Sequence, residues 1–384
     1  MTATSHHQAT ARISSLDLLR ACLVAWIIGG HALLGYSAIG GWAYDEVNEV
    51  TLAAGSELVL AAVLGPSALF LMGTFFLVAG LFTPRSLAGK GASRFARERA
   101  LRLGVPFLAT AFVLWPLFLW LTYRAAGRSV SYGWLLTGRN RQLDSGALWF
   151  AEVLLIFSFG YLAVHALRRR TPRDRGSPGP LRVPELVLWT GGIALCTFLL
   201  RLWIPARSTQ IGDPHLWQWP QLAAMFALGV AGARRGLAEH VPERVWRVCG
   251  RIVLGTVLVI PLVAVSLGVT NLAQDIGPFL GGWRWQSAAT ASVEALLVVF
   301  GSVWLLGFAQ RRFDGTGRFA SAAARGSFTA FVVQGPVLLS LAIALRPLAV
   351  PAEVKMVLVA TLGLAACFGI GWIAVTRTRL GRYL

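Results

Sequence analysis

Residues 15–37 read SLDLLRACLVAWIIGGHALLGYS, and this stretch sets the class of the protein. Apart from Asp17 and Arg20 near its start it is apolar, and it is about as long as the roughly 20 residues that a helix needs to cross a bilayer core. No convincing cleavage site follows before Tyr36, as a removed signal peptide would require. We therefore interpret the stretch as a retained transmembrane helix.

Nine further apolar runs of similar length follow along the chain. The ten predicted helices have approximate limits 15–37, 57–82, 104–123, 146–167, 184–204, 218–236, 251–271, 286–309, 327–345 and 352–375. The sequence thus predicts an all-α, polytopic transmembrane helix bundle of about ten helices, with both termini on the same side of the membrane.

The composition supports the same class. Of the 384 residues, 56% are hydrophobic and 14% are charged, whereas a soluble domain carries roughly 25% charged residues. The formal net charge of +18 alone would fit a nucleic-acid-binding protein. However, only Lys90 and Lys355 are lysines, and the arginines gather between the apolar runs. This pattern is typical of a membrane protein and excludes a soluble enzyme, a disordered chain and a nucleic-acid partner.

The positive charges also predict the orientation. Of the 35 Lys and Arg residues, 25 fall in the N-terminus, the even-numbered connections and the C-terminal tail, against eight on the other side. Cytoplasmic loops carry such an excess, so both termini are predicted to be cytoplasmic, in a multi-pass protein of the plasma membrane. The predicted plan is a tail over 1–14, one transmembrane domain over 15–375 and a basic tail over 376–384. The connection 168–184 is rich in Pro, Gly and Arg and is expected to be a loose linker.

The cysteines give no sign of a metal site or a disulfide framework. Cys22, Cys196, Cys249 and Cys367 lie far apart, and no CxxC or Cys/His ligand spacing is present. We expect no bound metal.

Arg20 and His31 are the first candidate functional residues, because ionisable groups at membrane depth are costly. They are eleven residues apart, which places them about 20° from one another around a helix and about 16 Å apart along it. Arg20 lies nearer the cytoplasm and His31, a titratable base, lies further out. This arrangement suits an anionic substrate that enters from the cytoplasm and reacts within the membrane. Alternatively, Arg20 extends to lipid phosphates and His31 makes an interhelical hydrogen bond.

Two carboxylates are also predicted at membrane depth, Glu152 in the fourth helix and Glu294 in the eighth. Either could orient His31, as carboxylates do in acid–base sites. Alternatively, each is a carboxylate that is satisfied by a neighbouring Ser, Trp or Arg, and for Glu294 this alternative is favoured.

Five short motifs occur in an order and spacing that resemble the acyltransferase-3 family of integral-membrane acyltransferases. The motifs are Leu16–Arg20 with His31, Phe75–Phe82 (similar to FFxxSGF), Arg99–Pro106 (similar to RxxRLxxP), Leu148–Phe150 (LWF) and Ser327–Phe331. Two positions depart from the family pattern. Ala79 replaces a serine, and Gln334 stands where many relatives carry a histidine, so any role of that histidine is lost or taken by an amide. The chain resembles the shorter members of this family, which have no added extracytoplasmic domain. We therefore expect the membrane domain and its loops to select the acceptor.

The resemblance implies transfer of an acyl group, of acetyl or succinyl type, from cytoplasmic acyl-CoA to a hydroxyl of a glycan, glycolipid or secondary metabolite. His31, assisted by Glu152, would be the general base or would carry the acyl group briefly. Arg20, Arg99 and Arg102 would bind the phosphates of acyl-CoA, since guanidinium groups form charge-assisted hydrogen bonds with phosphate. The alternative for Arg99 and Arg102 is anchoring to lipid. Oligomeric state is left open.

Aromatic residues crowd the predicted outer loops and helix mouths, where sugars stack on such rings. The residues expected to bind the acceptor are Trp149, His215, Trp217, Trp219, Trp283 and Trp285. The alternative is the aromatic belt found at membrane interfaces generally.

A proton-coupled transporter or flippase is the main rival function, with Arg20, His31 and Glu152 along its substrate path. The lack of a recognisable internal repeat in the sequence argues against it. A membrane scaffold is a second rival, and it would tolerate loss of His31.

Overall fold

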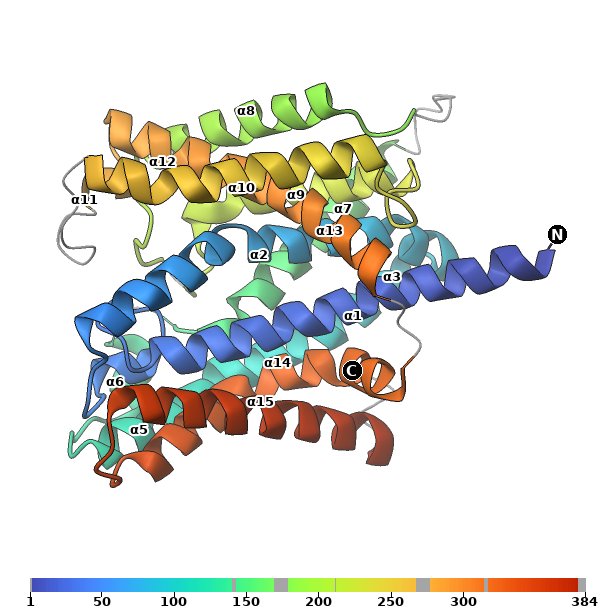
Figure 1. Ribbon diagram of the computed structural model, residues 1–384. Coiled ribbons are helices and arrows are strands. Elements are labelled where there is room, and N and C mark those ends of the chain that lie inside the picture. The colour runs from blue at the N-terminus through green and yellow to red at the C-terminus, as the bar shows by residue number, and fades with distance from the viewer. Residues whose placement is uncertain are drawn as a thin grey trace.

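A computed structural model describes residues 2–139, 143–168, 179–210, 212–266, 277–313 and 317–378. The described chain is helical, without strands, which confirms the predicted all-α bundle. Figure 1 shows the helices in stacked layers, with α8, α10 and α12 on one side, α1, α14 and α15 on the other, and α2, α9 and α13 between them. The helical elements are α1 (Thr2–Leu34), η1 (Ala43–Glu46), α2 (Ala54–Lys90), α3 (Ala92–Arg99), η2 (Ala100–Gly104), α4 (Val105–Ala109), η3 (Thr110–Leu114), α5 (Trp115–Ala125), α6 (Tyr132–Thr137), η4 (Gly146–Leu148), α7 (Trp149–Arg168), α8 (Val183–Leu200), η5 (Leu216–Gln218), α9 (Trp219–Ala233), α10 (Glu243–Ser266), α11 (Gly277–Leu280), α12 (Trp285–Leu296), η6 (Leu297–Gly301), α13 (Ser302–Arg312), α14 (Arg318–Leu345) and α15 (Ala352–Arg377).

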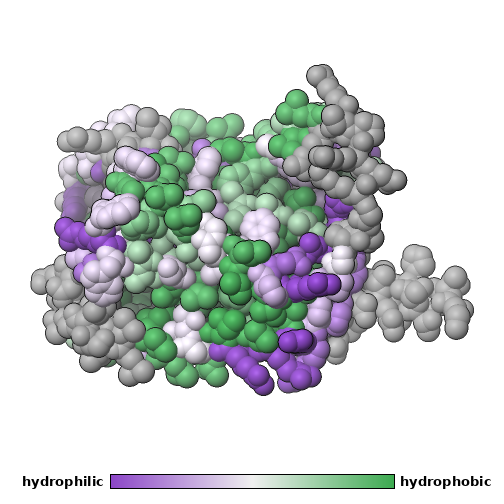
Figure 2. Space-filling view, turned by 90° about the horizontal axis from the view of Figure 1, so that it is seen from above, coloured by the Kyte–Doolittle hydropathy of each residue, from purple (hydrophilic) through white to green (hydrophobic). Residues whose placement is uncertain are grey.

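Eight segments of the described chain are long and apolar enough to cross a membrane. They correspond to all the predicted runs except the sixth and seventh. The sixth run forms the 15-residue α9 and the seventh forms α10, so the count of ten spans stays a prediction. In Figure 2 hydrophobic residues cover much of the visible face and hydrophilic residues gather mostly toward its margins, as expected of a surface that meets lipid.

The orientation of the termini stays a prediction from the charge distribution. Most of the expected linker 168–184 and most of the basic tail 376–384 lie outside the described residues. The residues predicted as an N-terminal tail belong to α1, which begins at Thr2.

The third predicted helix is longer than its apolar run and is irregular. It continues from Ala92 to Ala125, with π-helical turns at Ala100–Gly104 and Thr110–Leu114. Each turn directly precedes a helix with proline near its start, Pro106 and Pro116 respectively. Proline lacks an N–H and its ring clashes with the carbonyl four residues earlier, and a π-turn accommodates both effects.

Helices α2 and α9 pack closely at the centre of the bundle through two glycines. A methyl group built on Gly80 would lie 2.2 Å from the carbonyl oxygen of Phe226, and one on Gly229 would lie 2.2 Å from that of Leu77. Small residues allow such close backbone approach between membrane helices. This contact fixes the position of the motif segment Phe75–Phe82 within α2.

Candidate functional site

A cavity of about 260 Å³ opens at the end of the bundle where α2 turns into α3. Its mouth is lined by four cationic side chains, Arg20 of α1, Lys90 of α2, Arg99 of α3 and Arg102 of η2. Three of these were expected from the sequence to act together, and the structure brings them to one cavity. Lys90 was not expected, because nothing in the sequence shows that α2 continues beyond the apolar run to reach it.

Two acidic side chains partly balance these cations. Asp17 accepts a hydrogen bond from Arg20 at 3.2 Å, and Glu98 forms ion pairs with Lys90 and Arg94. The cavity mouth therefore keeps an excess of positive charge, suited to a polyanionic ligand.

Deeper in the cavity the lining becomes apolar. Val24 of α1, Ala79 of α2 and Leu154 of α7 contribute to the wall, together with several phenylalanines. Ala79 occupies the position at which the motif similar to FFxxSGF has serine, so this part of the wall has no hydroxyl group. A cationic mouth above an apolar chamber fits a ligand with a charged head and a less polar arm.

A group of phenylalanines forms the far end of the cavity. The ring of Phe150 lies 5.5 Å from that of Phe75 and 5.8 Å from that of Phe331, between ring centroids. All three line the cavity, and His31 is not among its lining residues. Since Val24 and His31 are seven residues apart on α1, the imidazole lies about 10 Å further along the helix axis than Val24.

His31 points into the bundle, toward α14. Its Nδ1 lies 2.9 Å from Oε1 of Gln334, and its ring stacks on Trp42 with centroids 4.3 Å apart and planes inclined by 16°. Gln334 is fully buried. Gln334 is the position where the sequence already suggested that an amide replaces a histidine, whereas the stacking of Trp42 on His31 was not anticipated.

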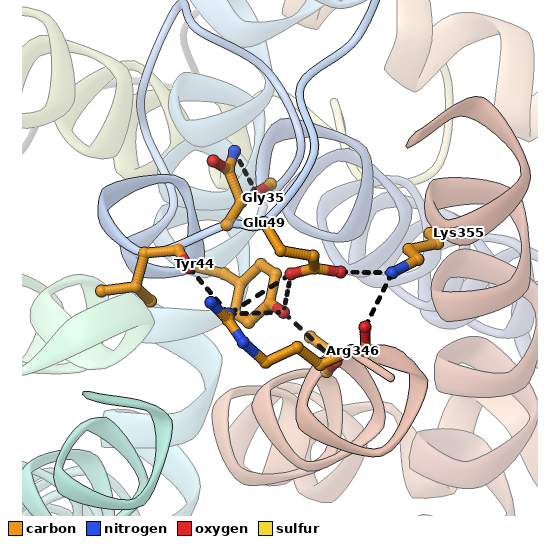
Figure 3. Close-up of polar contacts among 8 residues, drawn as sticks. Gly35, Tyr44, Glu49, Arg346 and Lys355 are labelled. Carbon is orange, nitrogen blue, oxygen red and sulfur yellow. Dashed lines mark hydrogen bonds and ion pairs between the residues drawn. The ribbon is translucent and has the colours of Figure 1, made fainter. Parts of the chain in front are cut away.

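The loop that carries Trp42 is anchored to the connection between α14 and α15 (Figure 3). The carboxylate of Glu49 accepts hydrogen bonds from Tyr44 at 2.7 Å and from Lys355, and it forms an ion pair with Arg346 at 3.3 Å. Arg346 also donates to the backbone carbonyl of Val47 at 2.8 Å. Through this cluster, residues far apart in the chain hold the Trp42 loop in place over His31.

Trp115 supports Trp42 from the other side. The two indole rings meet edge to face at 5.2 Å, and a methyl group on Gly335 would lie 3.0 Å from Trp115. The aromatic pair is thus packed against the α14 segment that carries Gln334.

Neither candidate carboxylate is the group bonded to His31 in the structure. Glu294 accepts hydrogen bonds at 2.6 Å from Arg201, which is fully buried, and at 2.6 Å from Gln221. This arrangement is the alternative considered for Glu294, a carboxylate neutralised by a neighbouring arginine. Glu152 lies beside Gly212, where a methyl group would be 3.8 Å from each carboxylate oxygen. Gln334 occupies the place beside Nδ1 that a carboxylate was expected to take.

Three of the residues expected to bind the acceptor, Trp149, His215 and Trp217, lie together at the start of α7. The ring of His215 lies 4.3 Å from Trp149 and 5.8 Å from Trp217. Trp217 in turn lies 5.2 Å from the guanidinium carbon of Arg201. Trp219 is nearby in sequence and donates to the carbonyl of Pro214 at 3.0 Å.

Trp283 and Trp285 are exposed, by 80% and 58% respectively. Trp283 packs on Phe198 rather than on the His215 group. Their exposure favours the membrane-interface alternative for these two residues.

The loop before α9 has an unusual backbone. Arg207, Asp213 and His215 all have positive φ angles, of 62°, 48° and 50°. Such conformations are rare for residues other than glycine and gather at functional sites. Burial lowers the pKa of His215 below its ordinary value, and the charge of Asp213 opposes this shift.

The family model for the acyltransferase-3 group, described as an acyltransferase domain, matches residues 13–376. No curated protein and no solved structure matches the chain.

Proposed function

The chain belongs to the acyltransferase-3 family, and on that premise we propose that it is a membrane O-acyltransferase that uses acyl-CoA as donor. The acyl group is of acetyl or succinyl type, and the acceptor is a hydroxyl of a glycan, glycolipid or secondary metabolite. One observation carries the proposal. Helix α1 has Arg20 in the mouth of the cationic cavity and His31 on the same helix, hydrogen-bonded inside the bundle.

The donor would bind at the cationic cavity. Arg20, Arg99, Arg102 and Lys90 supply donors for its phosphates, because guanidinium and ammonium groups form strong charge-assisted hydrogen bonds with phosphate. The apolar chamber would take the arm that carries the thioester. If the positive charges mark the cytoplasmic side, this mouth opens to the compartment that holds acyl-CoA.

The thioester would have to pass the phenylalanines at the end of the cavity to reach His31. Phe331 lies three residues before Gln334 on α14, so a displacement of its ring would open the cavity toward the imidazole. On this proposal the rings of Phe150 and Phe331, which line the cavity, would lie between the bound donor and His31.

At the reaction centre, His31 would act as the general base. It takes the proton of the acceptor hydroxyl while the oxygen attacks the thioester carbon. The carbon–sulfur bond then breaks, and the departing thiolate of CoA takes up the proton from the imidazolium. Positioned general bases contribute typically 10²–10⁴-fold to the rate.

The acceptor would bind on the opposite side of the bundle. The rings of Trp149, His215 and Trp217 offer stacking surfaces of the kind that sugars use, and Glu152 offers a carboxylate beside the same loop. We assign Trp149, His215 and Trp217 to the acceptor before Trp283 and Trp285, which stand apart.

Release of CoA by the purified protein tests the proposal. Reconstituted protein is given acetyl-CoA or succinyl-CoA and an extract of cell-envelope glycans and metabolites, and the products are analysed by mass spectrometry. We expect free CoA together with an acceptor that is heavier by one acyl unit. A transporter or flippase would release no CoA, and that result would overturn the proposal.

Arg20→Ala tests the donor site separately. We expect acyl-CoA to bind more weakly to this variant, because one cation of the cavity mouth is lost. Arg247→Ala is the matched control, since Arg247 is 63% exposed on α10 and does not line the cavity. Equal affinity of Arg20→Ala and the control would refute this role of Arg20.

A further inference from the structure

We infer that Gln334 is a positioning residue that holds neutral His31 with its proton on Nδ1 and so leaves Nε2 as the basic nitrogen. The tautomer follows from the hydrogen bonds alone, and only the use of Nε2 in acyl transfer rests on the proposed function.

The orientation of this amide is determined by the backbone. The Nε2 atom of Gln334 lies 3.0 Å from the carbonyl oxygen of Phe331. A carbonyl oxygen only accepts hydrogen bonds, so the atom that faces it must be the NH₂ group. The oxygen of the amide is therefore the atom that faces the imidazole. Because Gln334 is fully buried, turning the amide over would place its oxygen against the carbonyl oxygen of Phe331 and leave that buried amide oxygen without a donor.

The amide oxygen in turn determines the proton on the ring. Oε1 of Gln334 has no hydrogen to donate, and it lies 2.9 Å from Nδ1 of His31. A hydrogen bond at this distance requires a proton on Nδ1. Neutral imidazole carries one N–H, so Nε2 keeps its lone pair. Among the described residues, no side chain forms a hydrogen bond with Nε2.

Trp42 restricts the ring to this orientation. The indole lies nearly parallel to the imidazole at 4.3 Å, and it is itself packed against Trp115. Rotation of the imidazole about its Cβ–Cγ bond would drive the ring edge into the indole. Nδ1 therefore stays on the side of Gln334, and Nε2 stays on the side away from the Cβ atom.

An amide has a different effect from the carboxylate of a Ser-His-Asp triad. Both accept the Nδ1 proton and fix the tautomer, but the carboxylate also stabilises the positively charged ring. Gln334 carries no charge, so the resting site needs no buried ion pair at this depth, where charges are costly. The single free lone pair on Nε2 is what either a general base or a transient acyl carrier would use.

Nitrogen-15 NMR of the reconstituted full-length protein, labelled on histidine, tests the tautomer without any substrate. The His31 signals are identified by their loss in His31→Ala. We expect the protonated ring nitrogen of wild-type His31 to be Nδ1, from its couplings to the neighbouring ring carbons. Protonation of Nε2 in neutral wild-type His31 would overturn the inference, whatever the outcome with the Gln334 variant.

Two variants separate positioning from general packing. In Gln334→Leu, which removes the acceptor at similar volume, we expect the proton to move to Nε2 or to be shared between the nitrogens. In Gln310→Leu, which removes hydrogen bonds to the backbone at Leu237 and Val241, we expect the His31 signals to stay unchanged. An unchanged tautomer in folded Gln334→Leu would also overturn the inference.

Kinetics connect the tautomer to the proposed reaction. We expect Gln334→Leu to lower kcat by about 10²-fold or more, at an unchanged Kd for acyl-CoA, because Gln334 does not line the donor cavity. A loss of acyl-CoA affinity with unaltered kcat would contradict the positioning role. If the wild type shows the Nδ1 proton but releases no CoA, the tautomer stands and the proposed function fails.

Discussion

Replacing Gly80 by alanine should damage the bundle at its centre. The added methyl group would lie 2.2 Å from the carbonyl oxygen of Phe226, 3.0 Å from the amide nitrogen of Val230 and 3.1 Å from the Cα atom of Gly229. All three contacts are backbone atoms of α9, so no side chain can turn away. The two helices must separate, and the neighbouring Ala79, which lines the cationic cavity, must move with α2.

The magnitude follows from two opposing effects. Overpacking of a close contact costs typically 1–3 kcal/mol, and a rigid backbone neighbour places this case at about 3 kcal/mol. Alanine also favours the helix over glycine by about 1 kcal/mol. We therefore expect Gly80→Ala to lower the free energy of unfolding by about 2 kcal/mol.

The matched control is Gly160→Ala in α7, where a methyl group would meet no atom within 4 Å. That variant should be neutral or slightly more stable than the wild type. Denaturant unfolding of the detergent-solubilised proteins measures both. If Gly80→Ala is as stable as Gly160→Ala, the close packing of α2 on α9 is not as described, and the reasoning is refuted.

Three further predictions concern charged groups. Glu294→Leu should lower the free energy of unfolding by about 3–5 kcal/mol because it leaves buried Arg201 unpaired. Arg247→Ala, which removes an exposed ion pair, should lower it by less than about 1 kcal/mol. Equal unfolding midpoints of the two variants would contradict this prediction. Burial raises the pKa of Asp45 to about 6, so the folded state holds this proton more tightly than the unfolded state. Stability should therefore fall as pH rises from about 4 to about 6, by less than the roughly 3 kcal/mol of the full shift because the side chain is only partly buried and solvent screens it. Asp45→Asn should flatten that pH dependence in thermal unfolding, and an unaltered slope would show that another group is responsible. Arg102→Ala should weaken acyl-CoA binding by about tenfold at low salt and by a smaller factor at high salt. A loss of affinity that does not depend on salt in a binding titration would argue against a phosphate contact.

Much of the fold could be predicted from the sequence because a membrane helix is encoded by one continuous apolar run, whose length and polarity can be read without knowing its neighbours. The apolar runs located eight segments now described as long enough to span a membrane. The limits of the third helix were wrong at its start, because the basic segment Ala92–Arg99 is helical although it is not apolar. Hydropathy detects the part of a helix that lies in lipid, and this one extends beyond it.

The candidate site was predictable where both residues lie on one element. Arg20 and His31 share α1, so helix geometry alone related them. Contacts between segments that are far apart in the chain could not be predicted from the sequence. Nothing in the sequence places Trp42 on His31, because their contact depends on the anchoring of the loop by Glu49 and Lys355.

The carboxylates show the same limit. Glu152 and Glu294 were both possible partners of the imidazole, since periodicity gives the depth of a residue but not the helix that it faces. The structure pairs Glu294 with Arg201 on α8. Gln334 stands out in the sequence because it departs from the family's pattern at a position where many relatives carry a histidine. That departure is the sequence's sign that the residue matters to the site, and the structure shows its contact with His31.

The most direct test of the account is acyl transfer by His31→Ala, measured beside acyl-CoA binding by the same protein, with His240→Ala outside the cavity as control. We expect His31→Ala to lose transfer by at least about 10²-fold while it binds acyl-CoA like the wild type, and His240→Ala to keep both. Transfer at the wild-type rate by folded His31→Ala would contradict it.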